Sequence, residues 1–406
     1  MMKKVPKRRF KGFLNAGDWE QRKLGELGKT FNGLTGKTKK DFGHGDAQYI
    51  TYLNVFQNTI SDLSMTERIE IDKSQNTVQY GDILFTTSSE TPEEVGMSSV
   101  WLGEKPNTYL NSFCFGYRPT VDIDHQFMGN LLRSPHVRNE MKILAQGISR
   151  YNISKNKVMD LEITLPSKEE QKLIGSILNH IDSQLTLHQR KLEKLQATKK
   201  ALLYELFPIE NSRRPKRRFK GFTDDWEQCK LGDIVKSYSG GTPTASNKEY
   251  YGGDIPFIRS AEINSDTTEL YITQKGLDNS SAKIVDKGTI LYAMYGATSG
   301  EVGISKINGA INQAILAMRP LEYNGKIIEQ YLRKNKKSII GKYLQGGQGN
   351  LSASIILELP IQLPGLEESN QIANFLESFD NLITLHQRKL EKLKNLKAAY
   401  LNEMFV

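Results

Sequence analysis

The chain has 406 residues, of which 38% are hydrophobic and 25% are charged, and this ordinary globular composition argues against extensive disorder. Lys and Arg outnumber Asp and Glu by 55 to 46, so the net charge of +9 favours a polyanion such as nucleic acid as a partner. No apolar run reaches the roughly 18 residues of a membrane-spanning helix, and no apolar stretch near the start predicts a secretory signal. Two cysteines, Cys114 and Cys229, lie far apart and indicate a reducing compartment, which we expect to be the cytoplasm.

A basic segment occurs twice in the chain. Residues 6–13 read Pro-Lys-Arg-Arg-Phe-Lys-Gly-Phe, and residues 215–222 read the same. Each copy is followed by an Asp-Trp-Glu-Gln segment, at 18–27 and at 225–234. Because the repeat unit is about half of the chain, it indicates a tandem duplication of a domain and not a solenoid. Basic arms of this kind can clamp DNA phosphates or serve as linkers, and the sequence leaves both alternatives open.

Between the repeated segments, each half contains a region that diverges from the other half. Faint matches remain, such as Gly81-Asp-Ile-Leu-Phe85 with Gly288-Thr-Ile-Leu-Tyr292, and they indicate a shared fold with different surfaces. Short β-branched runs cut by Gly, Pro, Asn and Asp predict strands, so we expect mixed α/β domains in an α+β protein. The predicted elements are strands at 82–87, 289–294 and 310–318 and short helices at 126–134 and 326–336.

Each half ends in a segment that the other half repeats without a gap. Residues 165–207 and 363–405 align at a constant offset of 198, with 22 of 43 positions identical. Apolar residues recur at alternating steps of three and four, which predicts a helix from about 168 to 206 and an equivalent second helix. Ser167 and Glu170 predict a capping box at the first helix, and Gly365 with Glu368 predicts a weaker cap at the second. The predicted seam positions are Leu185, His188, Leu192, Leu195, Ile383, His386, Leu390 and Leu393.

The apolar stripe of each predicted helix needs a partner. The simplest partner is the other copy, which gives two antiparallel coiled-coil helices related by a pseudo-two-fold axis. The alternative is that each helix pairs with another subunit, and both arrangements can hold through different faces.

Motifs for catalysis are missing from the sequence. Gly25-Glu-Leu-Gly-Lys-Thr30 resembles a phosphate loop, but Lys23 stands where the first Gly of that motif should be. No Asn/Asp-Pro-Pro-aromatic tetrapeptide, no Gly-x-Ser-x-Gly elbow and no metal-ligand spacing around a histidine is present. The sequence therefore predicts a binding protein that holds no metal and no cofactor of its own.

Candidate contacts to nucleic acid lie in the divergent regions. Cations, aromatic rings and amides contact phosphates and base edges, and such side chains gather there in both halves. Each of them alone is more simply a solvated residue, but as a set in a basic protein they favour nucleic-acid binding. The candidates are Lys37, Lys39, Lys40, Arg150, Tyr151 and Asn152 in the first half and Thr242, Lys248, Tyr250, Tyr251, Arg259 and Gln348 in the second.

Taken together, these segments resemble the specificity subunit of a Type I restriction–modification system. The resemblance covers essentially the whole chain. It is carried by the tandem Pro-Lys-Arg-Arg-Phe and Asp-Trp-Glu-Gln-x-Lys-Leu-Gly openings, Ser239-Gly-Gly-Thr-Pro243, Gly253-Asp-Ile-Pro-Phe-Ile258, Asn350-Leu-Ser352 and the Leu-Pro-x-x-Glu-Glu helix start.

The resemblance implies a division of labour along the chain. Each divergent domain would be a target recognition domain that reads one half of a bipartite double-stranded DNA site, and the helices would set the gap between the half-sites. The implied organisation is a basic arm at 1–17, a first recognition domain at 18–165, a long helix at 166–212, a linker repeating the arm at 213–224, a second recognition domain at 225–362 and a second long helix at 363–406.

The resemblance also implies partners. Two methyltransferase subunits would dock on the chain and bring S-adenosylmethionine, and restriction or translocase subunits would bring ATP and Mg²⁺. The chain itself would be a non-catalytic DNA-binding subunit. Two alternatives come from other classes of protein: an enzyme, either a methyltransferase or a nuclease with an unrecognised site, and a coiled-coil scaffold without a DNA role.

Overall fold

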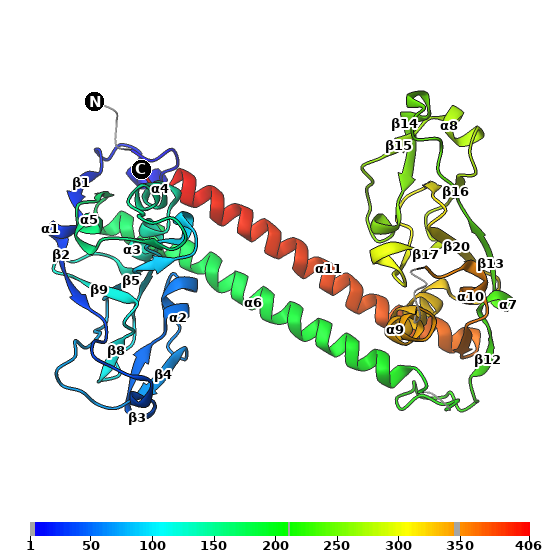
Figure 1. Cartoon of the computed structure of the whole chain (residues 1–406), viewed down its shortest axis with the longest axis horizontal. Helices are drawn as coiled ribbons and strands as arrows, with labels where there is room; N and C mark the ends of the chain where they lie inside the picture. The colour runs from blue at the N-terminus through cyan, green and yellow to red at the C-terminus, as the bar shows by residue number, and fades with distance from the viewer. Residues whose placement is uncertain (1–4, 210–211, 345–349) are drawn as a thin grey trace. The chain divides into compact units, whose positions relative to one another are not determined.

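Two long helices dominate the computed structural model, which describes residues 5–209, 212–344 and 350–406 (Figure 1). Helix α6 runs from Lys168 to Leu206 and helix α11 from Leu366 to Glu403, so the predicted long helices are confirmed. The chain folds into two units, of which the first comprises Met1–Arg190 with Gln387–Val406 and the second Lys191–His386. Both helices therefore contribute one end to each unit.

Within each unit, the two helices run antiparallel and are joined by an equivalent ion pair. In the first unit, Lys397 Nζ lies 2.6 Å from Asp182 Oδ1. In the second unit, Lys199 Nζ lies 2.5 Å from Asp380 Oδ1, which is the same pair displaced by the repeat offset. A residue early in one helix thus meets a residue late in the other, and this confirms the antiparallel arrangement.

The predicted seam positions differ in exposure from the residues beside them. Leu192 and Leu390 are buried, and the other six seam positions are half-buried. Leu187 and Leu385, which lie outside the three-and-four pattern, are exposed.

The first unit contains two small sheets and two separate strand pairs, β1-β11 and β10-β6. The antiparallel four-stranded sheet has the order β2-β9-β5-β7, and the three-stranded sheet has the order β4-β3-β8 with β3 and β8 parallel. The strands are β1 (Glu20–Lys23), β2 (Gly28–Asn32), β3 (Phe42–Ile50), β4 (Thr66–Ile69), β5 (Ile83–Thr86), β6 (Ser88–Ser89), β7 (Ser98–Val100), β8 (Thr108–Leu110), β9 (Cys114–Pro119), β10 (Tyr151–Asn152) and β11 (Glu162–Leu165). The shorter helices are α1 (Leu24–Leu27), α2 (Tyr52–Gln57), α3 (His125–Leu132), α4 (Pro135–Ile143) and α5 (Lys155–Met159).

The second unit repeats the order of the four-stranded sheet and the strand pair beside it, as β12-β21 corresponds to β1-β11. Its four-stranded sheet β13-β20-β17-β18 corresponds to β2-β9-β5-β7, and its other sheet, β15-β14-β19-β16, adds one strand to the first unit's three. The strands are β12 (Glu227–Lys230), β13 (Val235–Ser239), β14 (Tyr251–Ile258), β15 (Tyr271–Ile272), β16 (Lys283–Val285), β17 (Ile290–Ala293), β18 (Val302–Ile304), β19 (Gly309–Ile311), β20 (Ile315–Pro320) and β21 (Pro360–Leu363). The shorter helices are α7 (Leu231–Ile234), α8 (Gln274–Asp278), α9 (Gly325–Tyr343) and α10 (Ala353–Leu357).

Three predicted element boundaries were wrong for local reasons. The single strand predicted at 310–318 is two strands, because the Asn312 side chain accepts a hydrogen bond from the Ala314 N–H (3.1 Å) and closes a turn between β19 and β20. The helix predicted at 326–336 continues to Tyr343 as α9, since no proline interrupts it. The helix predicted at 126–134 stops at Leu132, and Pro135 begins a new helix, α4.

The basic arms bind the starts of the long helices. Arg9 donates two hydrogen bonds to the Glu170 carboxylate, at 2.7 and 2.8 Å, and only 5% and 1% of these side chains are exposed. Arg218 and Glu368 make the same bidentate pair in the second unit. The predicted capping box was therefore half right: Ser167 Oγ accepts the Glu170 N–H (3.4 Å), but the Glu170 carboxylate binds Arg9 and does not turn back to the cap.

The arginine one position earlier in each arm, Arg8 or Arg217, binds the C-terminal end of the other long helix. The Arg8 backbone N–H donates to the Glu403 carbonyl (2.8 Å) and its side chain pairs with the Glu403 carboxylate (2.6 Å). Arg217 makes both contacts with Glu205. The sequence left open whether the arms clamp DNA phosphates or serve as linkers. These four arginines attach the arms to the long helices, because each of them binds a helix carboxylate.

The last residues of α11 and beyond complete the core of the first unit. Met404 and Phe405 are buried in it, and the Phe405 ring lies 5.5 Å from that of Phe127. The Thr164 hydroxyl of β11 also donates to the Val406 carbonyl (3.1 Å). In the second unit, Phe207 holds the equivalent place and contacts Trp226.

We predict that Arg9→Ala destabilises the first unit by about 3–5 kcal/mol, because it leaves the Glu170 carboxylate buried without its partner. Urea unfolding followed by tryptophan fluorescence measures this as a lower midpoint. The matched control is Arg8→Ala, which removes an exposed ion pair and should leave the midpoint nearly unchanged. Equal effects of the two variants would contradict the importance of the buried pair.

Candidate DNA interface

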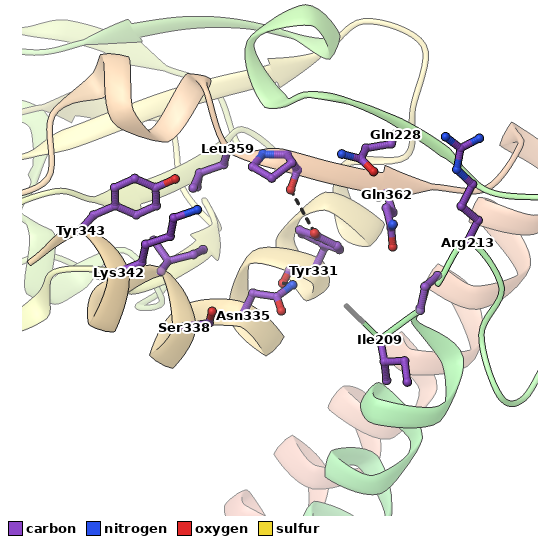
Figure 2. Close-up of a pocket in the computed structure, with 13 residues that line it drawn as sticks. Ile209, Arg213, Gln228, Tyr331, Asn335, Ser338, Lys342, Tyr343, Leu359 and Gln362 are labelled. Carbon is purple, nitrogen blue, oxygen red and sulfur yellow. Dashed lines mark hydrogen bonds between the residues drawn. The ribbon is translucent and has the colours of Figure 1, made fainter. Parts of the chain in front are cut away.

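The described part of the chain contains a cavity in its second unit but no group of ligands for a metal ion. Among those residues, no group of three or more His, Cys, Asp or Glu could hold a metal ion, and no helix is long and apolar enough to cross a membrane. A cavity of about 360 Å³ lies in the second unit beside α9 and β21 (Figure 2). The thirteen described residues that line it include no carboxylate, imidazole or thiol. Tyr331, on its wall, donates its hydroxyl to the Pro360 carbonyl (3.0 Å), as the dashed line in Figure 2 shows.

The basic loop predicted in the first half lies immediately before strand β3. Lys39 and Lys40 are exposed in a 3-10 turn, η2 (Lys39–Asp41). Lys37 is half-buried and its ammonium lies 2.6 Å from the Asp72 carboxylate, which raises the pKa of Lys37. The charge of Lys37 is therefore neutralised locally, and Lys39 and Lys40 are the exposed cations of this loop.

Arg150, Tyr151 and Asn152 lie in a hairpin beside strand β6. Tyr151 and Asn152 form β10, which pairs antiparallel with Ser89 and Ser88. Arg150 and Asn152 are exposed, whereas Tyr151 packs partly against the core. The hairpin thus fixes the backbone of all three residues next to the end of the four-stranded sheet.

The predicted residues of the second half gather around the start of strand β14. Lys248 and Tyr250 lie in the 3-10 turn η4 (Lys248–Tyr250), which holds the place that η2 holds in the first unit. The Tyr251 hydroxyl donates to the Pro243 carbonyl (2.6 Å), next to the exposed Thr242. Gln348 lies outside the described residues.

Arg259 is part of a charge cluster and not a free cation. Its guanidinium binds Glu262 (2.8 Å) and Glu269 (2.7 Å). The two carboxylates, Glu262 first, raise the pKa of Arg259, and its charge is balanced within the unit.

A family model matches both halves of the chain, at residues 16–197 and 223–395, and its description is "Type I restriction modification DNA specificity domain". The chain belongs to the Type I restriction–modification specificity subunits. The tandem duplication and the resemblance stated from the sequence are both confirmed, because each half contains one copy of the domain.

Relatives and solved structures match along nearly the full length of this specificity subunit. The putative type I restriction enzyme MjaX specificity subunit of Methanocaldococcus jannaschii is 27% identical over 404 residues, which are 95% of this chain and 92% of the relative. The MjaVIII specificity subunit of the same organism is 23% identical, with 95% and 91% covered. The S subunit of a Type I system from M. genitalium has a TM-score of 0.68 at 17% identity and 99% coverage of both chains, so the predicted fold class is confirmed.

Sequence reasoning did not select two side chains that contact the predicted Arg150 in this specificity subunit. Ser88 Oγ accepts a hydrogen bond from Arg150 Nη2 (3.2 Å), and the Phe113 ring lies 6.0 Å from the guanidinium carbon. Sequence reasoning also did not select Gln313 of the second unit, which contacts the predicted Thr242. Gln313 Oε1 accepts a hydrogen bond from the Thr242 hydroxyl (2.6 Å). These partners are distant in sequence, and only the exposure of the phenylalanine side chain distinguishes Phe113 from a core residue.

We predict that Gly147→Ala opens the hairpin that contains Arg150. Gly147 has a φ of 137°, and an added Cβ would lie 2.1 Å from the Arg150 carbonyl oxygen. Strain of this kind costs on the order of 1–3 kcal/mol, which should accelerate amide exchange across residues 146–152 by about 10-fold or more. Hydrogen exchange with mass spectrometry measures this.

The matched control for the hairpin is Gly17→Ala, which adds a Cβ with no atom within 4 Å. Unchanged exchange in Gly147→Ala would show that the hairpin tolerates a side chain at this position.

Proposed function

We propose that this specificity subunit determines which DNA sequence a Type I modification complex recognises. Each recognition domain reads one half of a bipartite double-stranded target. One observation carries the proposal: the sheets β2-β9-β5-β7 and β13-β20-β17-β18 have the same strand order, while equivalent surface positions hold different side chains. The turn before the long strand, for example, reads Lys39-Lys40-Asp41 in one unit and Lys248-Glu249-Tyr250 in the other. Two readers with one scaffold and different surfaces are what two different half-sites require.

The recognition domains are proposed to span 18–165 and 225–362, and the conserved helices are proposed to have two tasks. First, their length sets the gap between the half-sites, since half-site spacing follows from the distance between two DNA readers. Second, their repeated surfaces dock two methyltransferase subunits at equivalent positions. Those partners would supply S-adenosylmethionine, and restriction or translocase subunits would supply ATP and Mg²⁺.

The chain is proposed to bind DNA without catalysing a reaction, in the cytoplasm. Support comes from the family, and from a cavity whose described lining residues include no carboxylate, imidazole or thiol. Transfer of methyl groups by the purified chain alone with S-adenosylmethionine, or DNA cleavage by it with Mg²⁺, would overturn this part of the proposal. A coiled-coil scaffold without a DNA role would show no DNA binding at low salt.

The proposal is tested by sequencing the methylated bases of a host that carries the chain with its methyltransferase partner. The expected result is one enriched motif made of two short half-sites separated by unspecified bases. Methylation without an interrupted motif would refute the proposed function.

We predict that replacing residues 18–162 with the equivalent domain of another specificity subunit changes one half-site and leaves the other unchanged. The reason is that these residues contain every strand of the first unit's two sheets. Methylome sequencing of the chimaera measures the outcome. A change in both half-sites would contradict separate reading by the two domains.

We predict that inserting one heptad into both helices lengthens the gap by about three base pairs, because seven helical residues add about 10 Å and one base pair about 3.4 Å. The insertions belong between Arg190 and Lys191 and between Arg388 and Lys389, which are equivalent under the repeat offset. The same methylome readout shows whether the half-sites stay intact while the gap changes.

The control for the heptad insertion places it in α6 alone. Because α6 is then longer than α11 between the Asp182–Lys397 and Lys199–Asp380 pairs, the two pairs cannot both form, and the insertion should abolish methylation instead of moving the gap. An unchanged gap in the doubly extended chain would show that the helices do not set the spacing.

A further inference from the structure

The hairpin from Gln146 to Asn152 holds Arg150 in a defined place. Its ends are joined by two backbone hydrogen bonds, Gln146 N–H to the Asn152 carbonyl (2.9 Å) and Asn152 N–H to the Gln146 carbonyl (2.8 Å). The Ile148 side chain at its tip is 96% exposed. A closed hairpin loses little conformational freedom when it binds a ligand, so a side chain that it carries is well suited to recognition.

The hairpin is fixed to the end of the four-stranded sheet. Strand β10 pairs with β6, and the Ile153 N–H donates to the Thr87 carbonyl (3.0 Å). The Thr87 hydroxyl in turn donates to the Phe113 carbonyl (2.8 Å). Three segments that are distant in sequence therefore meet at this edge, and rigid elements position the side chains that they present.

Two side chains orient the Arg150 guanidinium. Ser88 Oγ accepts one of its N–H groups at 3.2 Å, and the Phe113 ring lies under it at 6.0 Å from the ring centre. Phe113 is itself held by its N–H, which donates to Asn111 Oδ1 (2.8 Å), yet 55% of the residue is exposed. An exposed ring with an exposed cation beside it presents both an apolar face and hydrogen-bond donors to a ligand.

The charge of Arg150 is not neutralised within the described part of the chain, where no carboxylate pairs with it. Some other arginines of the first unit are engaged by acids, as Arg118 is by Asp82 (2.7 Å) and Arg9 by Glu170, and Arg133 and Arg138 bind backbone carbonyls. One donor of Arg150 binds Ser88, and a guanidinium has five N–H groups in a planar fork. A free bidentate edge therefore remains for an acceptor outside the chain.

We propose that Arg150 reads a guanine in the half-site of the first recognition domain, with Ser88 and Phe113 as its positioning residues. This rests on the proposed function. A planar fork matches the O6 and N7 acceptors of guanine in the major groove, and arginine is the commonest side chain to make this contact. A phosphate is the competing acceptor and also matches the fork, but a phosphate contact gains nothing from an apolar ring beside the guanidinium.

The test uses the complete chain with its methyltransferase partner and reads the methylated motif across a host genome. In Arg150→Gln, the preference for guanine at one position of the first domain's half-site should fall on the order of 10- to 100-fold, because glutamine matches adenine instead. Every other position and the second half-site should stay unchanged. Arg150→Met, which keeps the aliphatic stem, provides a second variant with the same expectation.

The matched control is Arg22→Gln, which removes a partly exposed guanidinium on β1 of the same unit that pairs with Glu20 and Glu26. The motif should stay unchanged in this variant. For the positioning role, Phe113→Ala should weaken the guanine preference and Phe113→Tyr should restore it, since tyrosine keeps the ring.

The outcomes separate this proposal from the function on which it rests. Uniformly weaker methylation of an unchanged motif in Arg150→Gln would show a phosphate contact and overturn the guanine assignment, while the specificity function stands. A full guanine preference in both Arg150 variants would overturn it as well. If the unaltered chain gives no interrupted motif, the proposed function fails first.

Discussion

The bidentate pair between a buried arginine and a buried glutamate is the interaction on which each unit depends. A charge removed from water is costly unless a partner of matching geometry neutralises it, and Arg9 with Glu170 meets this condition through two parallel hydrogen bonds. Glu170 lies in the first turn of α6, where the helix dipole also favours a negative charge. Arg218 and Glu368 repeat the arrangement in the second unit. Arginines of the most basic segments of the sequence are therefore used for contacts within the fold.

The division between scaffold and surface follows from these contacts. The repeated segments supply the arms, the long helices and the strand pairs that join them, and four arginines of the arms pair with carboxylates of these helices. The divergent segments supply loops and strand ends where cations such as Lys39 and Lys40 remain exposed. The two units therefore share a scaffold and differ in the exposed side chains of the divergent segments.

The repeat made the helices and the duplication predictable, because an ungapped match fixes architecture and a three-and-four pattern fixes helical phase. The sequence could not show that Glu170 binds Arg9, since a glutamate three residues after a serine fits a capping box equally well. The turn at Asn312 was also missed, because an apolar run gives no sign of a side chain that closes a turn. In the candidate interface, Arg150 is predicted from its chemistry, but its partners lie more than thirty residues away, Ser88 in β6 and Phe113 in the turn before β9. Tertiary proximity of that kind leaves no local pattern.

The placement of Met404 and Phe405 in the core of the first unit has a consequence for how the chain folds during synthesis. Residues 403–406 supply contacts to Arg8, Phe127 and Thr164, and these contacts cannot form until the end of the chain has been synthesised. The domain that leaves the ribosome first is therefore the last to be completed. The second unit draws only on residues 191–386 and can close earlier. A message cut short near its end would therefore damage the beginning of the protein, and a reader with one finished domain would recognise half a target.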